Sequence, residues 1–326
     1  MADIFRSVYL FPPSMPRPVK PPRLKTGSKV RIVAPGSPVE EARLKDGLQE
    51  LARLGYLART SSNVLSRDGY FAGNTDTRRG ELEVALASVD EAAVFCARGG
   101  YGSNYLLDGL RPSGFRFPKV LLGYSDITTV QIFLWEKLGW VTFYGPMVAA
   151  GLDGGANGSA GYDLRSFQCA LTETESSWSL SLEGEVLVGG QAEGVLLGGC
   201  LTLIETSIGT PWELDTKGAI LLLEDRGMRP YQVDRALVHL KQAGKLRDVR
   251  GFVLGEFPEC DPPAESNVTV LDALRRLLPE AGVPVVWRAP IGHTPRPMLT
   301  VPLGIPVRLD ASGPGRLEVL EPAVVS

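Results

Sequence analysis

The sequence alternates regularly between short apolar runs and amphipathic stretches, from Lys29 to about residue 138. The run Lys29–Ala34 has the composition of a strand, and leucines then recur at helical spacing from Leu44 to Leu54. Later pairs of strand and helix lie near 56–59 and 79–86, near 92–97 and after 102, and near 119–123 and 127–138. This alternation predicts βαβ units, hence an α/β fold with a mostly parallel sheet and helices on both faces.

The start of the first helix has a recognisable pattern. Ser37 and Glu40 have the spacing of a capping box, and Pro38 would occupy the first helical position. The pattern predicts that the helix begins here.

A chain of 326 residues is longer than one small hydrophobic core usually serves, which predicts two domains. The second half is richer in strand-like runs, with two helical patterns near 233–243 and 268–278. The glycine-rich segment Gly151–Gly161 has no apolar period. We therefore expect a proline-rich arm over 1–28, lying on the surface or on a partner subunit, an α/β domain over 29–150, a linker or flexible loop over 151–178, and a β-rich domain over 179–326.

Composition limits the classes of partner and ligand that we expect for this chain. A formal net charge of -3 gives no reason to expect nucleic acid or an anionic membrane surface. The four cysteines form no CxxC pair, so we expect no metal site, no cofactor and reduced cytosolic thiols. No apolar run suits a signal peptide or a bilayer span, which predicts a cytoplasmic protein.

Ser125 lies where a strand turns into a helix. The run Val120–Gly123 is followed by Tyr124, Ser125 and Asp126, a pattern like a nucleophile elbow without its second glycine. In such a turn the serine hydroxyl is exposed, and the Asp126 N–H could stabilise an oxyanion. Alternatively, Ser125 or Asp126 merely caps the helix.

The chain has two histidines. His239 falls off the apolar stripe of its helix, which predicts a solvated side chain. His293 follows a strand in an irregular segment, so it is either a catalytic base or a turn histidine. Glu224 ends an apolar strand and needs a partner: it could orient His293, or pair with Arg226 or Arg229.

The turn Arg98–Gly102 contains three glycines, which allow a backbone to approach a ligand closely. It lacks the G-K-[ST] of a phosphate loop, so nucleotide binding there is disfavoured. Gly100 could supply a second oxyanion N–H, and Arg98 could hold a substrate carboxylate. Tyr101 is a further candidate for substrate contact.

Together these residues resemble the LD-carboxypeptidases, serine peptidases that include the muramoyl-tetrapeptide carboxypeptidases and the microcin C self-immunity peptidases. The matching pieces span nearly the whole chain. In order, they are Val33–Ser37, Phe71–Gly73 with Arg78, Arg98–Gly102, Gly123–Asp126, Gly145–Met147, Gly198–Gly199, Leu223–Asp225, Tyr231 with Asp234–Arg235, and Gly292–His293.

The resemblance implies a catalytic triad of Ser125 as nucleophile, His293 as general base and Glu224 as its orienting carboxylate. It also implies an oxyanion hole made by the N–H groups of Gly100 and Asp126. The implied fold is a flavodoxin-like or amidotransferase-like N-terminal domain with a small, β-rich, barrel-like C-terminal domain, usually in a homodimer.

The implied activity is hydrolysis of an L,D-peptide bond that releases D-alanine from peptidoglycan-derived tetrapeptides, as in murein recycling. Two departures bear on the substrate: Met228 stands where the family often has an acidic residue, and Cys200 where it commonly has asparagine.

Three other functions remain open. The chain could cleave a microcin-like peptidyl-nucleotide, with Trp212 as a candidate for stacking on the base. It could be a binding protein that keeps the fold without catalysis. A third alternative is a cysteine nucleophile, Cys96 or Cys200.

Overall fold

The structure is a computed structural model that describes residues 13, 15–61, 63–264 and 266–326. The chain divides into two compact units. The N-terminal unit comprises Pro18–Glu175, Pro295–Pro302 and Pro322–Ser326. The C-terminal unit comprises Met1–Arg17, Ser176–Thr294 and Leu303–Glu321. The last residues of the chain therefore return to the first unit.

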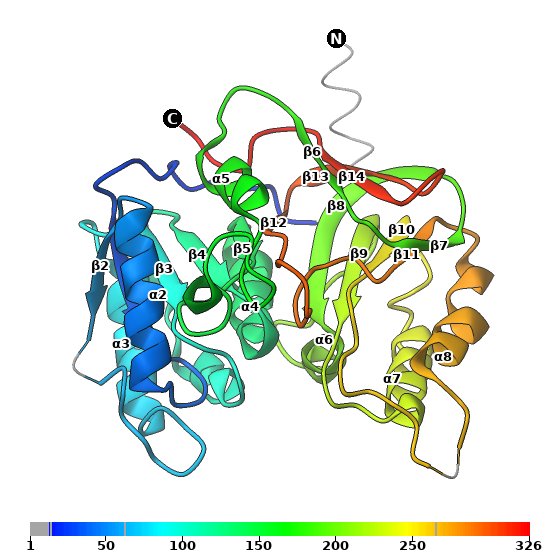
Figure 1. Ribbon diagram of the computed structural model, residues 1–326, viewed down its shortest axis with the longest axis horizontal. Coiled ribbons are helices and arrows are strands. Elements are labelled where there is room, and N and C mark those ends of the chain that lie inside the picture. Colours follow the sequence, from blue (N-terminus) through cyan, green and yellow to red (C-terminus); the bar gives the residue numbers. More distant parts are fainter. Residues whose placement is uncertain (1–12, 14, 62, 265) are drawn as a thin grey trace. The chain divides into compact units, whose positions relative to one another are not determined.

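The N-terminal unit is built on a six-stranded sheet with the order β12-β5-β4-β3-β1-β2 (Figure 1). Neighbouring strands from β2 to β5 pair in parallel, which confirms the predicted α/β fold with a parallel sheet. The strands are β1 (Lys29–Val33), β2 (Leu57–Thr60), β3 (Ala93–Cys96), β4 (Val120–Gly123), β5 (Thr142–Tyr144) and β12 (Val301–Leu303). The helices are α2 (Glu41–Arg53), α3 (Thr75–Ala87), α4 (Thr128–Leu138) and α5 (Leu164–Thr172).

Strands β3 and β4 are apolar and buried at every position, as expected for central parallel strands with both faces covered. The order of strands reverses between β1 and β3, which are hydrogen-bonded neighbours. In open α/β sheets, ligands bind beyond the carboxyl ends of the strands at such a reversal. The two loops at this position follow Val33 and Cys96.

The structure corrects the start of α2. The helix begins at Glu41, and the side chain of its N-cap residue Glu40 makes no capping hydrogen bond, so the predicted capping box is wrong. The Ser37 hydroxyl instead accepts a hydrogen bond from the N–H of Tyr101 at 3.1 Å. The sequence spacing fits a cap, but the Ser37 hydroxyl instead binds the backbone of a loop that is distant in sequence.

Short 3-10 helices connect several elements. The helix predicted after Gly102 is the 3-10 helix η1 (Ser103–Gly109). The others in this unit are η2 (Pro112–Gly114), η3 (Ser125–Ile127) and η4 (Leu152–Gly154).

The glycine-rich segment is tied to α2. Asp153 accepts from Arg43 at 2.5 Å, and the Tyr162 hydroxyl donates to Glu50 at 2.6 Å. Helix α5 follows, capped by the Asp163 carboxylate, which accepts the Ser166 N–H at 2.6 Å. The stretch expected to be a linker or flexible loop therefore contains η4 and a capped helix, and residues up to Glu175 belong to the N-terminal unit.

Residues 1–12 and 14 of the expected arm lie outside the described residues. From Pro18 onward, the arm runs along the N-terminal unit. Val19 bridges Trp140, Arg23 donates its N–H to the Val325 carbonyl at 2.7 Å, and Leu24 donates to Leu171 at 2.9 Å. This part of the arm is therefore tied to the unit that contains α4 and α5.

The C-terminal unit contains an eight-stranded mixed sheet with the order β6-β14-β13-β8-β9-β10-β11-β7. Its centre, β8 to β11, is parallel, and the flanking strands pair antiparallel. The strands are β6 (Trp178–Ser181), β7 (Glu185–Val188), β8 (Gln191–Cys200), β9 (Ala219–Glu224), β10 (Gly251–Leu254), β11 (Val285–Trp287), β13 (Pro306–Asp310) and β14 (Arg316–Val319).

This unit is rich in strands, as predicted, but its sheet does not close. Among the described residues β6 and β7 end the strand order without pairing to each other, so the barrel-like expectation is wrong. Helices α7 (Pro230–Gln242) and α8 (Val270–Leu277) lie side by side and are linked by an Arg276–Asp234 ion pair of 2.8 Å (Figure 1). The other helices of its described part are α6 (Leu201–Ser207) and η5 (Pro279–Ala281).

Candidate active site

Ser125 has a backbone conformation that is rare for serine. After β4, Tyr124 is extended and Ser125 has a φ of +63°. Non-glycine residues in this region carry strain that the surroundings must offset, and such strain is common at functional turns. The Ser125 N–H donates to the Tyr144 hydroxyl at 3.2 Å. Neither η3 nor α4 has a side-chain N-cap, so Ser125 and Asp126 are not capping residues here.

The glycine turn after β3 lies directly against this serine. A Cβ placed on Gly99 would lie 3.0 Å from the Ser125 Cβ and 3.3 Å from the amide nitrogen of Asp126. A Cβ on Gly100, whose φ is +92°, would lie 2.5 Å from the Ser37 Cβ. Only glycine fits both positions without displacement, so the close approach of the two backbones accounts for the glycine pair.

Asp126 ties the turn that contains Ser125 to the segment after the same glycine turn. Its side chain is buried, and Oδ2 accepts the N–H of Ser103 at 2.9 Å and the Ser103 hydroxyl at 2.7 Å. Burial raises the pKa of the Asp126 carboxyl above its ordinary value, although the hydrogen bonds from Ser103 act in the opposite direction. The Asp126 side chain therefore joins the start of η1 to the turn that contains Ser125.

Arg78 fastens the loops from the other side. It is almost fully buried in α3, and burial lowers the pKa of its guanidinium. The guanidinium donates to the carbonyls of Pro35 at 2.5 Å, Gly73 at 3.1 Å and Gly102 at 2.8 Å. It also lies over the Phe71 ring, 4.6 Å from the centroid. One buried cation thus holds three loops at the carboxyl end of the sheet.

In the C-terminal unit, His293 and Glu224 form a tight pair. Oε2 of Glu224 lies 2.7 Å from His293 Nδ1 and accepts the backbone N–H of His293 at 2.9 Å. The Glu224 side chain is fully buried at the end of β9. Two hydrogen bonds to one oxygen fix both the backbone and the ring, so Nδ1 would carry the proton and Nε2 would be the basic nitrogen.

Two glycines make room for the Glu224 carboxylate. A Cβ on Gly292 would lie 2.5 Å from the Glu224 Cγ, and a Cβ on Gly255 would lie 2.6 Å from the Glu224 Cβ. Gly292 also has a φ of +77°. Arg226, the alternative partner for Glu224, instead pairs with Glu259.

The local charges set the state of His293. Burial lowers the pKa of the imidazole, but the charge of Glu224, its hydrogen bond and the nearby Asp225 together raise that pKa above the ordinary 6.5. The Asp225 carboxylate has its own partner, because its Oδ2 accepts from the N–H and hydroxyl of Thr202 at 2.8 and 2.7 Å. The pair is thus arranged to stabilise an imidazolium.

The other residues considered in the sequence analysis are divided between the two units. Arg98 is exposed and donates to the Pro38 carbonyl at 3.1 Å, and Tyr101 is 43% exposed beside it in the glycine turn. Trp212 is half-buried in the turn after α6 in the C-terminal unit. His239 is half-exposed and contacts Glu205, as predicted for a solvated position.

The cysteine alternative fits the structure poorly. Cys96 and Cys200 are buried, and burial raises the pKa of both thiols. A buried neutral thiol is a weak nucleophile. Within the described residues, no three His, Cys, Asp or Glu side chains are grouped as metal ligands.

Four residues near Ser125 escaped prediction as parts of the site: Ser37, Arg78, Ser103 and Tyr144. Each acts on a loop distant in sequence, through one hydrogen bond or several. Arg78 had a signal, because it belongs, with Phe71–Gly73, to one of the runs that resemble the family. Ser37 also had one, as the end of the matching run Val33–Ser37, whereas Ser103 and Tyr144 had none.

Comparison with known proteins identifies the family of this chain. The profile of the LD-carboxypeptidase N-terminal domain matches residues 30–145, and that of the C-terminal domain matches residues 193–309. The chain belongs to the LD-carboxypeptidase family. A putative carboxypeptidase of Streptomyces coelicolor is 39% identical over 94% of this LD-carboxypeptidase and 98% of its own length. A probable murein peptide carboxypeptidase of Bacillus subtilis is 35% identical over 87% and 89%.

Solved structures agree with this membership. The muramoyltetrapeptide carboxypeptidase of Oxalobacter formigenes is 30% identical, with a TM-score of 0.79 over 90% of this chain and 99% of that one. The microcin C7 self-immunity protein has the same fold, with a TM-score of 0.87 at 24% identity over 94% and 100%. This LD-carboxypeptidase is therefore a peptidase. In its described residues, no helix has both the length and the hydropathy to cross a bilayer.

Proposed function

We propose that this LD-carboxypeptidase is a serine carboxypeptidase that removes the terminal D-residue from murein-derived tetrapeptides. Ser125 is the nucleophile, His293 the general base and Glu224 the carboxylate that orients the imidazole. The observation that carries the proposal is the pair of hydrogen bonds from His293 to one buried Glu224 oxygen. A histidine held in this way has a fixed tautomer, as general-base catalysis on a serine requires.

In the proposed reaction, His293 takes the Ser125 hydroxyl proton as Oγ attacks the scissile carbonyl carbon. The C–N bond then breaks, and the imidazolium gives its proton to the leaving amine. Water, deprotonated by the same imidazole, releases the acyl group and restores the serine. The mechanism requires the two units to bring His293 to Ser125 in the active enzyme.

The N–H groups of Asp126 and Gly100 are proposed to bind the oxyanion. The support is the close approach of the glycine turn to Ser125, together with the +63° φ of Ser125, which re-aims the following N–H. Removing one such donor costs about 3 kcal/mol of transition-state stabilisation in known enzymes.

The substrate assignment draws on the relatives. The Bacillus subtilis protein is named a probable murein peptide carboxypeptidase, and the Oxalobacter formigenes protein a muramoyltetrapeptide carboxypeptidase. Both are at least 30% identical to this chain over most of its length. The likeness to the microcin C7 self-immunity protein concerns the fold alone, so it does not favour a peptidyl-nucleotide substrate. The exposed Arg98 remains the candidate for the terminal carboxylate.

The decisive experiment offers the purified protein a tetrapeptide with a C-terminal D-alanine and the same peptide ending in L-alanine. Released alanine is measured by mass spectrometry, with Ser125→Ala as the control for the nucleophile. We expect release from the D-peptide only, and its loss in Ser125→Ala. Cleavage by Ser125→Ala at the rate of the unmodified enzyme would exclude Ser125 as the nucleophile.

A further inference from the structure

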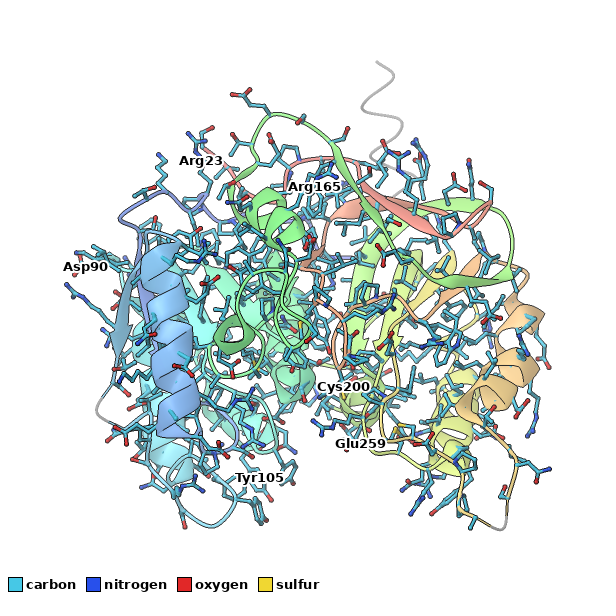
Figure 2. All side chains as sticks on the ribbon, in the orientation of Figure 1. Arg23, Asp90, Tyr105, Arg165, Cys200 and Glu259 are labelled. Carbon is cyan, nitrogen blue, oxygen red and sulfur yellow. The ribbon has the colours of Figure 1, made fainter. Side chains whose placement is uncertain are left out.

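Four aromatic side chains gather in the N-terminal unit outside the proposed catalytic residues: Tyr70, Phe71, Tyr101 and Tyr105. The ring centroids of Tyr101 lie 5.8 Å from Tyr70, 6.0 Å from Phe71 and 6.0 Å from Tyr105. Three of them remain open to solvent, with exposed fractions of 62% for Tyr70, 43% for Tyr101 and 51% for Tyr105. Figure 2 shows the Tyr105 side chain projecting from the edge of the ribbon.

This aromatic cluster lies at the carboxyl end of the sheet, where the strand order reverses. The Ala72 N–H donates to the Gly36 carbonyl at 2.9 Å, which ties the Tyr70–Phe71 turn to the loop after β1. The Tyr101 N–H donates to Ser37 in that loop. The cluster therefore occupies the position at which open α/β sheets bind ligands.

The Phe71 ring and the backbone beside Tyr101 are also held in place. Arg78 lies under the Phe71 ring and binds the Gly102 carbonyl next to Tyr101. Tyr105 and Tyr101 share a hydrogen bond, which raises the pKa of the Tyr105 hydroxyl. A preformed exposed aromatic surface loses little side-chain entropy when a ligand binds, which favours a binding role over an accidental patch.

The cluster lies within reach of the nucleophile. Gly99 packs against Ser125, and Tyr101 follows two residues later, so its Cα is at most about 7 Å from that of Gly99. The scissile bond of a tetrapeptide precedes its last residue, so three residues separate this bond from the amino end. Those three residues span at most roughly 11 Å when extended. A group attached to the amino end can therefore reach the cluster while the scissile carbonyl lies at Ser125.

We propose that Tyr70, Phe71, Tyr101 and Tyr105 form a subsite for the N-acetylated amino sugar at the amino end of the substrate. The inference rests on the proposed function. A pyranose presents a face of C–H groups that packs on aromatic rings, and its hydroxyl and acetamido groups can hydrogen-bond to phenol hydroxyls at the rim. The sugar ring carries no charge of its own, which suits a surface made of one phenylalanine and three phenols.

A flat nucleobase suits the cluster less well. Sandwiching a base requires two nearly parallel faces about 7 Å apart, twice the optimal carbon–carbon contact distance. Most ring pairs here are steeply tilted, by 45° to 84°. The one nearly parallel pair, Phe71 and Tyr101, has its centroids 6.0 Å apart at 27° and leaves too little space. The tilted rings make a faceted surface that fits a puckered ring better.

The test compares N-acetylmuramoyl-tetrapeptide with the same free tetrapeptide, using full-length protein. We expect a higher kcat/KM for the sugar-bearing substrate, and this advantage should fall about tenfold in Tyr105→Ala, mainly through KM. Phe117→Ala is the matched control, because Phe117 is 58% exposed and outside the cluster. It should keep the advantage. Circular dichroism checks that each variant is folded.

A binding measurement separates this inference from the proposed function. Saturation-transfer NMR with N-acetylmuramic acid on Ser125→Ala should show contact that is lost in Ser125→Ala/Tyr105→Ala. If the sugar binds in this way but neither substrate is hydrolysed by the unmodified enzyme, the subsite stands and the proposed function fails. Equal kcat/KM for both substrates in the unmodified enzyme would overturn the subsite, as would Tyr105-dependent binding of adenosine monophosphate without binding of the sugar.

Discussion

The two units position their proposed catalytic residues by different physical means. In the N-terminal unit, Ser125 is placed by backbone geometry, with a φ of +63° and a glycine turn packed against it. In the C-terminal unit, His293 is placed by a buried carboxylate that binds both its ring and its N–H. At the histidine, a change of charge should therefore cost more activity than a steric change, whereas the position of the serine should depend on steric fit.

The largest effect is expected from Glu224→Gln. The amide keeps the shape of the side chain but can present its NH2 group to His293 Nδ1, which favours the wrong tautomer and removes the charge that stabilises the imidazolium. We expect kcat to fall about 10⁴-fold, as for comparable triad substitutions, with little change in KM. Steady-state kinetics on the D-alanine tetrapeptide measures this. A fall below tenfold would show that Glu224 does not orient the base.

Gly292→Ala introduces a steric change at the His293–Glu224 pair, where we expect charge to have the larger effect on activity. The new methyl group would lie 2.5 Å from the Glu224 Cγ, so the carboxylate must move away from His293. A displacement near 1 Å can cost about 100-fold in kcat. Gly282→Ala is the matched control, since Gly282 has a similar φ of +65° but nothing within 4 Å of its Cβ position. Similar activity losses in both variants would assign the effect to backbone strain rather than to Glu224.

Gly99→Ala makes the corresponding change beside Ser125. The methyl group would contact the Ser125 Cβ at 3.0 Å and crowd the Asp126 N–H, and the backbone must give by a few tenths of an ångström. We expect kcat to fall about tenfold, less than in Gly292→Ala, because the shift is smaller. Gly114→Ala, with nothing within 4 Å, is the control in the same unit. Unchanged kcat in Gly99→Ala would mean that the glycine turn does not set the position of the serine.

The same contrast explains what the sequence could reveal. Parallel strands and helices follow from local patterns, namely apolar runs and helical spacing. Local patterns also make Ser125, Glu224 and His293 candidates, but their roles as a triad come from the resemblance to the family. The roles of Ser37 and Arg78 do not follow from local patterns, because their partners are backbone groups in loops brought together only by the sheet order. Ser37 shows the limit clearly. Its spacing to Glu40 fits a cap, yet the N–H of Tyr101 competes for the hydroxyl and takes it.

The barrel-like expectation failed for a similar reason. Alternating runs indicate strands, but whether a sheet closes depends on which strands pair at its edges. Here the central strands β8 to β11 are parallel, and the antiparallel additions end at β6 and β7. No local property of those two strands reports that they remain unpaired to each other.

The smallest effect concerns pH. Because Glu224 and Asp225 raise the pKa of His293 above 6.5, the proposed base is protonated and inactive at acid pH, and kcat/KM should rise with pH through a limb above 6.5. Removing the Glu224 charge in Glu224→Gln leaves burial as the main influence, so the residual activity should have its acid limb at lower pH. A pH profile of kcat/KM for both proteins measures the shift. An acid limb that stays in place in Glu224→Gln would show that it reports a group other than His293, and the electrostatic half of the contrast between the two units would fail.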